Sequence, residues 1–341
     1  MKKHAIPTPK QLPSGSWRIQ LLIDGRRISV TEGTESACIA RAMAIRENML
    51  APEDKSQKPS LSVAIDRYIE ARESILSPAT IRGYRNIQKS RFQSQMKRPV
   101  NALSERDWQR AVNAEAKLCA AKTLKNAWGF VSSVIREETG NLYSVSLPQV
   151  ISDPMEFLEP DQIKVFLEHA RGNKYEIPAL LALCSLRVSE IIALTWDQID
   201  MKDKIISVKG AVVPNEHHQY VKKKENKNQT SRREVPIMIP RLSEALEQAD
   251  RRTKKVVPFH PSSIRNGINR ICVSAGLPEV GTHGLRHSFA SLAYHLNMPE
   301  KIAMQIGGWS NDATMRKIYT HVSQKDVISY ENAMTAFYEN K

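Results

Sequence analysis

Two proline-containing stretches without a hydrophobic period divide the chain, APEDKSQKPS at residues 51–60 and a second at residues 147–155. A stretch whose apolar residues follow neither helix nor strand spacing has no face to bury, so each of the two reads as a linker. A chain of 341 residues is long enough for two or three domains, each with its own core. We therefore predict three domains, over residues 1–54, 59–147 and 155–341.

The N-terminal segment has the alternating pattern of a β-hairpin. Apolar residues alternate with polar ones over residues 17–21 and 28–30, on either side of Asp24-Gly25. Asp-Gly between two such runs is typical of a two-residue type I′ turn. Apolar residues then recur at helical spacing from about residue 35 to residue 50. The segment therefore predicts a small sheet packed against one helix.

Helical periodicity dominates the rest of the chain. The middle segment predicts four helices, and Ser77-Pro78 and Ser104 mark the starts of two of them. The C-terminal segment contains a strongly apolar helix that carries Arg187 and Glu190, then two short strands on either side of a long polar excursion. The predicted fold class is multidomain and mainly α with small β-sheets (α+β), and the last domain is mixed α/β.

The charge balance points to a polyanionic partner. Lys and Arg number 50 against 36 Asp and Glu, which gives a net charge of +14. A ribosomal, RNA-binding or membrane-surface protein has a similar balance, so charge alone does not choose among these classes. No window approaches the ~18 apolar residues of a membrane span, and no apolar run follows Met1. We expect a soluble cytoplasmic protein without a membrane partner.

The cysteines carry no metal-binding pattern. They are far apart in sequence, sit in apolar surroundings and form no C-x-x-C pair. This spacing favours reduced thiols in the core and argues against a zinc site, so we expect no metal. The residues concerned are Cys38, Cys119, Cys184 and Cys272.

Residues 281–321 hold groups suited to chemistry on a phosphodiester. His283 and Arg286 are three residues apart and so share one face of a helix. An apolar helix and the Gly307-Gly308 break separate them from the indole of Trp309 and the phenol of Tyr319. Donors of this kind hold non-bridging oxygens while a phenol attacks phosphorus. Taken singly, a His-x-x-Arg pair is usually a surface pair and a lone Tyr is usually half-buried packing.

Three motifs in this stretch, HGLRHSFAS, IGGWS and TMRKIYTHV, resemble the C-terminal boxes of the tyrosine recombinases, the phage integrase family. Upstream, SLRVSEIIAL resembles the first-arginine box of that family, in which glycine is usual at Ser185. The resemblance implies two phosphate clamps, Arg187 and Arg286, and a carboxylate, Glu190, that supports Arg187. The alternative for Arg187 and Glu190 is a plain salt bridge between residues one helical turn apart.

The resemblance also implies roles for the remaining groups of the site. His283 would act in proton transfer, and Tyr319 would be the nucleophile. Trp309 would donate its indole N–H where most members have histidine, although an indole cannot act as a base.

The polar excursion between the two strands holds a further candidate. Residues 222–233 contain six basic groups and one acidic group, which favours contact with phosphate. The leaving 5′ oxygen needs a proton, which a mobile ammonium can supply. In the family this lysine precedes a Val-Pro strand, and counting back from Val235-Pro236 indicates Lys227, with Lys224 as the alternative. Simple phosphate contact remains open for both lysines.

The other two segments also have counterparts in the family. The N-terminal segment resembles the arm-type DNA-binding domain of lambda-like integrases, and the middle segment resembles the helical core-binding domain that closes over the duplex. For each basic residue, ordinary solvated surface is the alternative to DNA contact. The candidate DNA-binding residues are Arg18, Gln20, Arg26, Arg27, Lys122, Lys125, Lys222, Lys223, Lys224, Arg232 and Arg233.

As a whole, the resemblance implies a site-specific DNA recombinase that integrates or excises a mobile element, a prophage or conjugative transposon. It implies a 3′-phosphotyrosyl intermediate and a Holliday junction, with no need for metal or ATP. Expected partners are double-stranded attachment-site DNA, a homotetramer with C-terminal tails exchanged between protomers, an excision factor and a DNA-bending protein, and the expected location is the nucleoid. The alternatives are a type IB topoisomerase-like enzyme and a non-cleaving descendant that acts as a repressor or architectural factor.

Overall fold

The computed structural model describes residues 6–23, 26–46, 58–151, 156–223, 232–310, 331 and 334–339. Tyr319, both candidate lysines of the excursion (Lys224 and Lys227) and the Asp24-Gly25 turn lie outside these residues, as does the side chain of Arg26. The described chain is mostly helical with small antiparallel sheets, which confirms the predicted fold class. No helix among the described residues is long and apolar enough to span a membrane.

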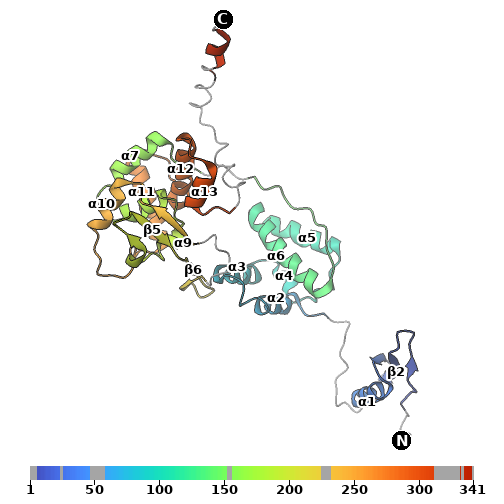
Figure 1. The fold of residues 1–341 in the computed structure, drawn as a ribbon. Coiled ribbons are helices and arrows are strands. Elements are labelled where there is room, and N and C mark those ends of the chain that lie inside the picture. The colour runs from blue at the N-terminus through green and yellow to red at the C-terminus, as the bar shows by residue number, and fades with distance from the viewer. Residues whose placement is uncertain are drawn as a thin grey trace.

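The N-terminal unit is a three-stranded sheet covered on one face by a helix (Figure 1). Strands β1 (Lys10–Gln11), β2 (Trp17–Ile23) and β3 (Arg26–Glu32) are antiparallel, and α1 spans Glu35–Arg46. Ile19 pairs with Val30, and both side chains are buried against Ala42 of α1. Because strand side chains alternate, Arg18 and Gln20 lie on the exposed face.

Five helices form the middle unit, which has its own hydrophobic core. Serine side chains cap three of them: Ser60, Ser77 and Ser104 each accept from a backbone N–H in the first turn. Trp108 and Trp128 lie at the centre of the core with ring centroids 5.5 Å apart. The helices are α2 (Leu61–Glu70), α3 (Pro78–Ser90), α4 (Gln93–Met96), α5 (Glu105–Ala116) and α6 (Ala121–Thr139).

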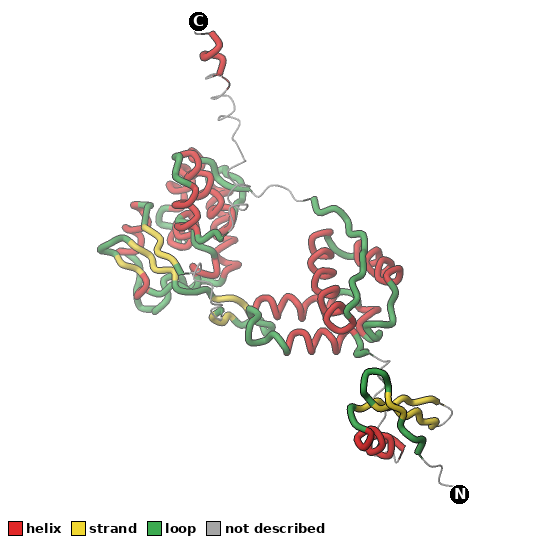
Figure 2. The backbone as a smooth tube through the Cα atoms, turned by 45° about the vertical axis from the view of Figure 1, so that its right-hand side comes forward, coloured by secondary structure: helices red, strands yellow, loops and turns green. Residues whose placement is uncertain are grey.

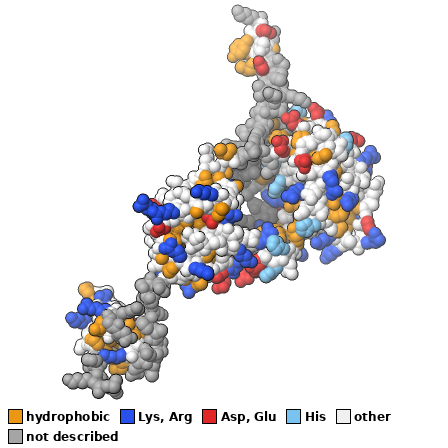
Figure 3. Space-filling view, turned by 180° about the vertical axis from the view of Figure 1, so that it is seen from behind, with side chains coloured by type: hydrophobic (Ala, Val, Ile, Leu, Met, Phe, Trp, Pro, Cys, Tyr) orange, Lys and Arg blue, Asp and Glu red, His pale blue; other side chains and the backbone are white. Residues whose placement is uncertain are grey.

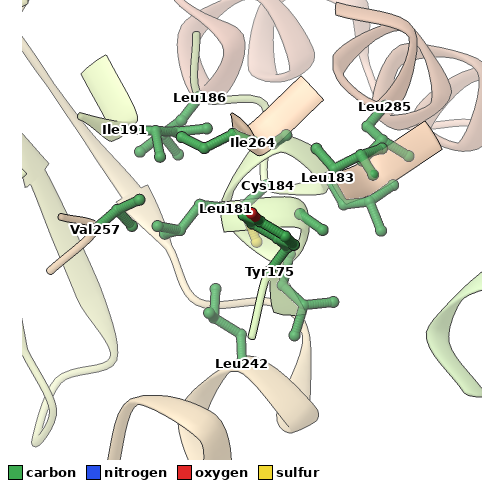
Figure 4. Close-up of a cluster of buried hydrophobic side chains, with 14 of the residues drawn as sticks. Tyr175, Leu181, Leu183, Cys184, Leu186, Ile191, Leu242, Val257, Ile264 and Leu285 are labelled. Carbon is green, nitrogen blue, oxygen red and sulfur yellow. The ribbon is translucent and has the colours of Figure 1, made fainter. Parts of the chain in front are cut away.

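The C-terminal unit surrounds the buried helix α8 (Glu176–Leu183). Figure 4 shows α8 side chains between Ile264, Leu285 and Leu242, which come from three other helices. A sheet in the order β4 (Ile199–Asp200), β5 (Ile205–Val208), β8 (Arg233–Pro236) and a separate pair, β6 (Val212–Pro214) with β7 (Tyr220–Lys222), lie beside these helices. The remaining elements are α7 (Pro160–Ala170), α9 (Val188–Ile191), the 3-10 turn η1 (Trp196–Gln198), α10 (Pro240–Glu247), α11 (Pro261–Ser274), α12 (Gly281–His295) and α13 (Glu300–Gly307).

The middle and C-terminal units meet where α3 lies against β6 (Figure 2). Arg85 of α3 pairs with Asp66 of α2, and its Nε lies 3.7 Å from the Glu216 carboxylate in the turn after β6. The β6–β7 hairpin, which precedes the basic residues of 222–233, is therefore in contact with the middle unit.

Candidate active site

A turn in the middle of the apolar stretch builds the centre of the site. The sequence predicts one helix through Arg187 and Glu190, which is wrong: α8 ends at Leu183 and α9 begins at Val188. Ser185, between them, is fully buried and adopts a left-handed φ of 72°. This conformation turns the Ser185 carbonyl toward two guanidinium groups, those of Arg286 and Arg233, which both donate to it.

Arg187 stands at the start of α9 and is held from both sides. Its Nη1 donates to Glu190 Oε1 over 2.9 Å, and its backbone N–H donates to Glu190 Oε2, also over 2.9 Å. Its Nη2 donates to the Gly308 carbonyl over 2.8 Å. The expected Arg187–Glu190 pair is thus present, and Arg187 also contacts the segment that follows α13. Its side chain remains 37% exposed, so it can still reach a ligand.

Glu190 is the only carboxylate within ion-pair distance of these guanidinium groups in the described part of the chain. Burial raises the pKa of this carboxyl, but the hydrogen bonds and charge of Arg233, together with Arg187, hold its pKa below the usual value. Glu190 is therefore ionised at neutral pH. One negative charge faces three guanidinium groups, which leaves the site with a net positive charge.

Arg286 of α12 is a buried cation with an unmet donor. Its Nη1 donates to the Ser185 carbonyl and its guanidinium carbon lies 4.3 Å from the centre of the Trp309 ring, but its buried Nη2 has no hydrogen-bond partner among the described residues. Burial, and then the positive charge of Arg187, lower its pKa to about 9, so it still carries its charge at neutral pH. An orphaned buried donor of this kind is satisfied by an anionic oxygen.

Two histidines accompany Arg286 on α12. Partial removal from water, then the charges of Arg286 and Arg187, lower the pKa of His283 below its usual value. For His287, burial and then His283 and Arg286 lower the pKa to about 4. Both rings are therefore neutral near pH 7, and a neutral imidazole can accept a proton. The exposed His283 ring meets this requirement of a general base.

The two glycines after α13 allow Trp309 to pack into the site. A Cβ at Gly307 would overlap the Trp309 ring. Gly308 has a left-handed φ of 62°, and a Cβ there would lie 3.0 Å from Arg233 Nη1. The indole stacks on Phe289, with ring centroids 6.1 Å apart, and covers Arg286. Trp309 therefore has a packing role in addition to the N–H donation predicted from the sequence.

Most of the candidate DNA-binding side chains are exposed. Figure 3 shows Lys and Arg side chains spread over the described units in one view, interspersed with Asp and Glu. The exposed candidates are Arg18, Gln20, Arg27, Lys122, Lys125, Lys222, Lys223 and Arg232.

Arg233 differs from its predicted setting as a phosphate contact. Its side chain is only 5% exposed and is bonded to Glu190 and to two backbone carbonyls. The number of basic residues in 222–233 does not distinguish buried from exposed side chains, but the alternation of side chains along a strand does. Arg233 lies two residues before the fully buried Val235, so both point to the same inner face of β8.

Comparison with known proteins agrees with this geometry. Residues 156–326 match the model of the phage integrase family. The chain belongs to this family. It is therefore a tyrosine recombinase, of the class that carries out site-specific recombination, as the resemblance predicted. Among relatives, the integrase of Staphylococcus phage L54a is 24% identical over 291 residues, which cover 71% of this chain and 81% of the relative.

Two solved structures share the fold of this tyrosine recombinase. The Tn1549 transposon integrase in complex with transposon right end DNA matches with a TM-score of 0.63 and 18% identity, covering 81% of this chain and 99% of that one. A lambda integrase tetramer bound to a Holliday junction matches with a TM-score of 0.55 and 15% identity, covering 91% of this chain and 97% of that one. At these identities the likeness shows the fold alone.

The structure thus brings five of the predicted groups of this recombinase into one place. Arg187 and Glu190 meet Arg286 at the Ser185 turn, and His283 and Trp309 lie beside Arg286. In the described residues no cluster of three His, Cys, Asp or Glu side chains is arranged to hold a metal ion. Arg233 is the residue that the sequence assigned to the wrong surroundings.

Proposed function

We propose that the protein cuts and rejoins DNA at specific sites, with Tyr319 as the nucleophile. The observation that carries this proposal is the unmet donor of Arg286 beside Arg187, in a site where three guanidinium groups face one carboxylate. Such a site is complementary to a phosphodiester whose negative charge grows in the transition state.

In the proposed cleavage step, Arg187 and Arg286 hold the non-bridging oxygens of the scissile phosphate. The Tyr319 oxygen bonds to phosphorus as the bond to the 5′ oxygen breaks, which leaves a 3′-phosphotyrosine and a 5′-hydroxyl. Lys227, or Lys224, donates the proton that the leaving 5′ oxygen takes up. The neutral His283 accepts the phenol proton, which a group with a pKa near ~10 does not give up unaided.

The proposed rejoining step is the reverse reaction with a different strand. The 5′-hydroxyl of a partner duplex attacks the phosphotyrosine, and Tyr319 leaves and recovers its proton. One phosphoester bond replaces another at each step, so no ATP is consumed. Two rounds of exchange pass through a Holliday junction, and the protein groups named above supply the donors for both.

The proposed biological setting follows from the relatives. The phage integrase and the transposon integrase both belong to mobile elements, which supports integration or excision of such an element by this chain. The lambda integrase tetramer on a Holliday junction supports a homotetramer on double-stranded attachment sites. We assign residues 1–54 to arm-site binding, 59–147 to core-site binding and 155–341 to catalysis and tail exchange. An excision factor and a bending protein complete the proposal.

The test uses a suicide substrate, a duplex from the end of the element with a nick next to the cleavage point. Incubation without metal or ATP, followed by a denaturing gel, should give a covalent protein–DNA band with the wild-type chain and none with Tyr319→Phe. Tyr294→Phe is the matched control, because it keeps its ring on α12 and loses only a hydroxyl. If wild type binds the duplex without forming the band, the non-cleaving alternative is favoured and the assignment fails.

A further inference from the structure

Arg233 joins three parts of the site. Its Nη1 and Nη2 donate to the two oxygens of Glu190 over 3.1 and 2.8 Å, and its Nε donates to the Ile306 carbonyl over 2.7 Å. Its Nη2 also donates to the Ser185 carbonyl over 3.4 Å. The first residue of β8 therefore ties α9, the Ser185 turn and the end of α13 together.

These bonds leave Arg233 little capacity for DNA. Each nitrogen of the guanidinium is already donating, and the side chain is 5% exposed. The two-pronged bond to Glu190 needs the planar fork of arginine, which a lysine cannot reproduce. The role of Arg233 must therefore lie in the protein groups that it bonds, which are Glu190 and the carbonyls of Ser185 and Ile306.

Arg233 holds Glu190, the carboxylate that supports Arg187. Glu190 is shared by the two arginines, with Oε1 accepting from Arg187 Nη1 and both oxygens accepting from Arg233. Without Arg233, the buried Glu190 would keep a single cationic partner and would either swing toward Arg187 or take up a proton. Either change alters the position of the partly exposed Arg187 guanidinium or the negative charge that faces it.

The same side chain also fixes the other end of the site. Ile306, which accepts from Arg233, lies directly before Gly307-Gly308. The Gly308 carbonyl accepts from Arg187. A Cβ at Gly308 would lie 3.0 Å from Arg233 Nη1, so the glycine break is fitted around this guanidinium. Arg233 thus contacts the chain on both sides of Gly307, just before Trp309.

We propose that Arg233 is a positioning residue for the recombination chemistry, acting through Glu190 on Arg187 and through Ile306 on the Trp309 segment. It is not a DNA contact. This inference rests on the proposed function, since the reaction it serves is the cleavage assigned to Tyr319.

The experiment compares Arg233→Gln with Arg232→Gln, its exposed neighbour in sequence. Each variant is measured for the salt dependence of DNA affinity and for the rate of covalent complex formation at saturating duplex. A lost phosphate contact lowers the log–log salt slope by about 0.9. For Arg232→Gln we expect this lower salt slope, together with a wild-type rate of covalent complex formation once the duplex is saturating. For Arg233→Gln we expect an unchanged slope and a saturating rate at least about tenfold lower.

A second variant distinguishes positioning from general damage to the fold. If Arg233→Gln lacks a cooperative thermal transition, Arg233→Lys carries the test, since it keeps the charge near Glu190 and loses the fork. Glu190→Gln should also slow the reaction. The double variant Arg233→Gln, Glu190→Gln should be less slow than the product of the two single effects, because the two residues share the Arg233–Glu190 contact.

The outcomes separate the two proposals. A wild-type rate for folded Arg233→Gln or Arg233→Lys, with wild type active, would overturn the positioning role alone. A lowered salt slope with a normal saturating rate would overturn it in favour of phosphate contact. A wild-type chain that binds DNA without covalent complex would overturn the proposed function, and this inference with it.

Discussion

At Ser185, the backbone conformation that builds the site conflicts with the side chain that occupies it. A left-handed φ costs a residue with a Cβ roughly 1–2 kcal/mol, and Ser185 has a φ of 72°. Its buried hydroxyl also has no hydrogen-bond partner among the described residues. The useful group is the carbonyl, which accepts from Arg286 and Arg233 and which any residue supplies.

Ser185→Gly should therefore stabilise the protein. Glycine removes the strain and the unmet hydroxyl, and it loses some of this gain because the unfolded chain becomes more flexible. We expect a net gain of about 1 kcal/mol, seen as a higher urea midpoint, with the cleavage rate retained. Ser189→Gly, within α9, is the control and should lower the midpoint because glycine weakens a helix. A midpoint for Ser185→Gly at or below that of wild type would contradict the strain argument.

At the scale of elements, the end of α13 is set by its two glycines. Gly307 is buried, and a Cβ there would overlap the Trp309 ring. Gly307→Ala should displace the indole from Arg286 and Phe289, because the added Cβ would take the position that the ring now occupies. We expect a loss of roughly 1–3 kcal/mol of stability from this overpacking, and slower covalent complex formation. Thermal denaturation and the suicide-substrate rate measure the two effects.

Gly129→Ala provides the control for this substitution. Gly129 lies inside α6, is exposed, and has no atom within 4 Å of the position that a Cβ would take. Alanine there should raise stability by about 0.5–1 kcal/mol through helix propensity. If Gly307→Ala denatured and cleaved like wild type, the position of Trp309 would not depend on the glycine.

Helices with clear start signals were predictable from the sequence. Ser77 and Ser104 were expected to begin helices. Ser77 caps α3 and Ser104 caps α5, each through its side-chain oxygen. The break between α8 and α9 was not predictable, because residues 179–194 are mostly apolar and periodicity cannot reveal a left-handed residue in a buried run. The resemblance supplied a hint, since glycine is usual at Ser185.

The sequence predicted which residues form the site better than it predicted which of them contact one another. The motifs indicated Arg187, His283 and Arg286, and the structure brings them together. Arg233 was misjudged because a run of basic residues was interpreted by its total charge, whereas the two-residue period of β8 assigns each residue a face. Long-range pairs, such as Arg187 with Gly308, have no signal in the local sequence.

For the molecule as a whole, the contact between the middle and C-terminal units is slight. The Arg85–Glu216 pair is partly exposed at 3.7 Å, and such pairs contribute at most about 1 kcal/mol. Figure 2 shows the two units apart beyond the contact of α3 with β6. With a net charge of +14, binding of a polyanion by basic residues of both units would hold them together far more strongly.

Lys122 and Lys125 test this contribution from the helical unit. Both are exposed near the start of α6. The positive charge of Lys122, in the first turn, opposes the helix dipole, and alanine forms helices at least as well as lysine, so the two lysines do not serve helix stability. Replacing both with Ala should leave thermal stability equal or higher while lowering the log–log salt slope of DNA affinity by about 1.8. Lys164→Ala on α7, on the side of its unit away from α2–α6 in Figure 1, should leave the slope unchanged. An unchanged slope in the double variant would mean that the two lysines are solvated surface and that DNA is held elsewhere.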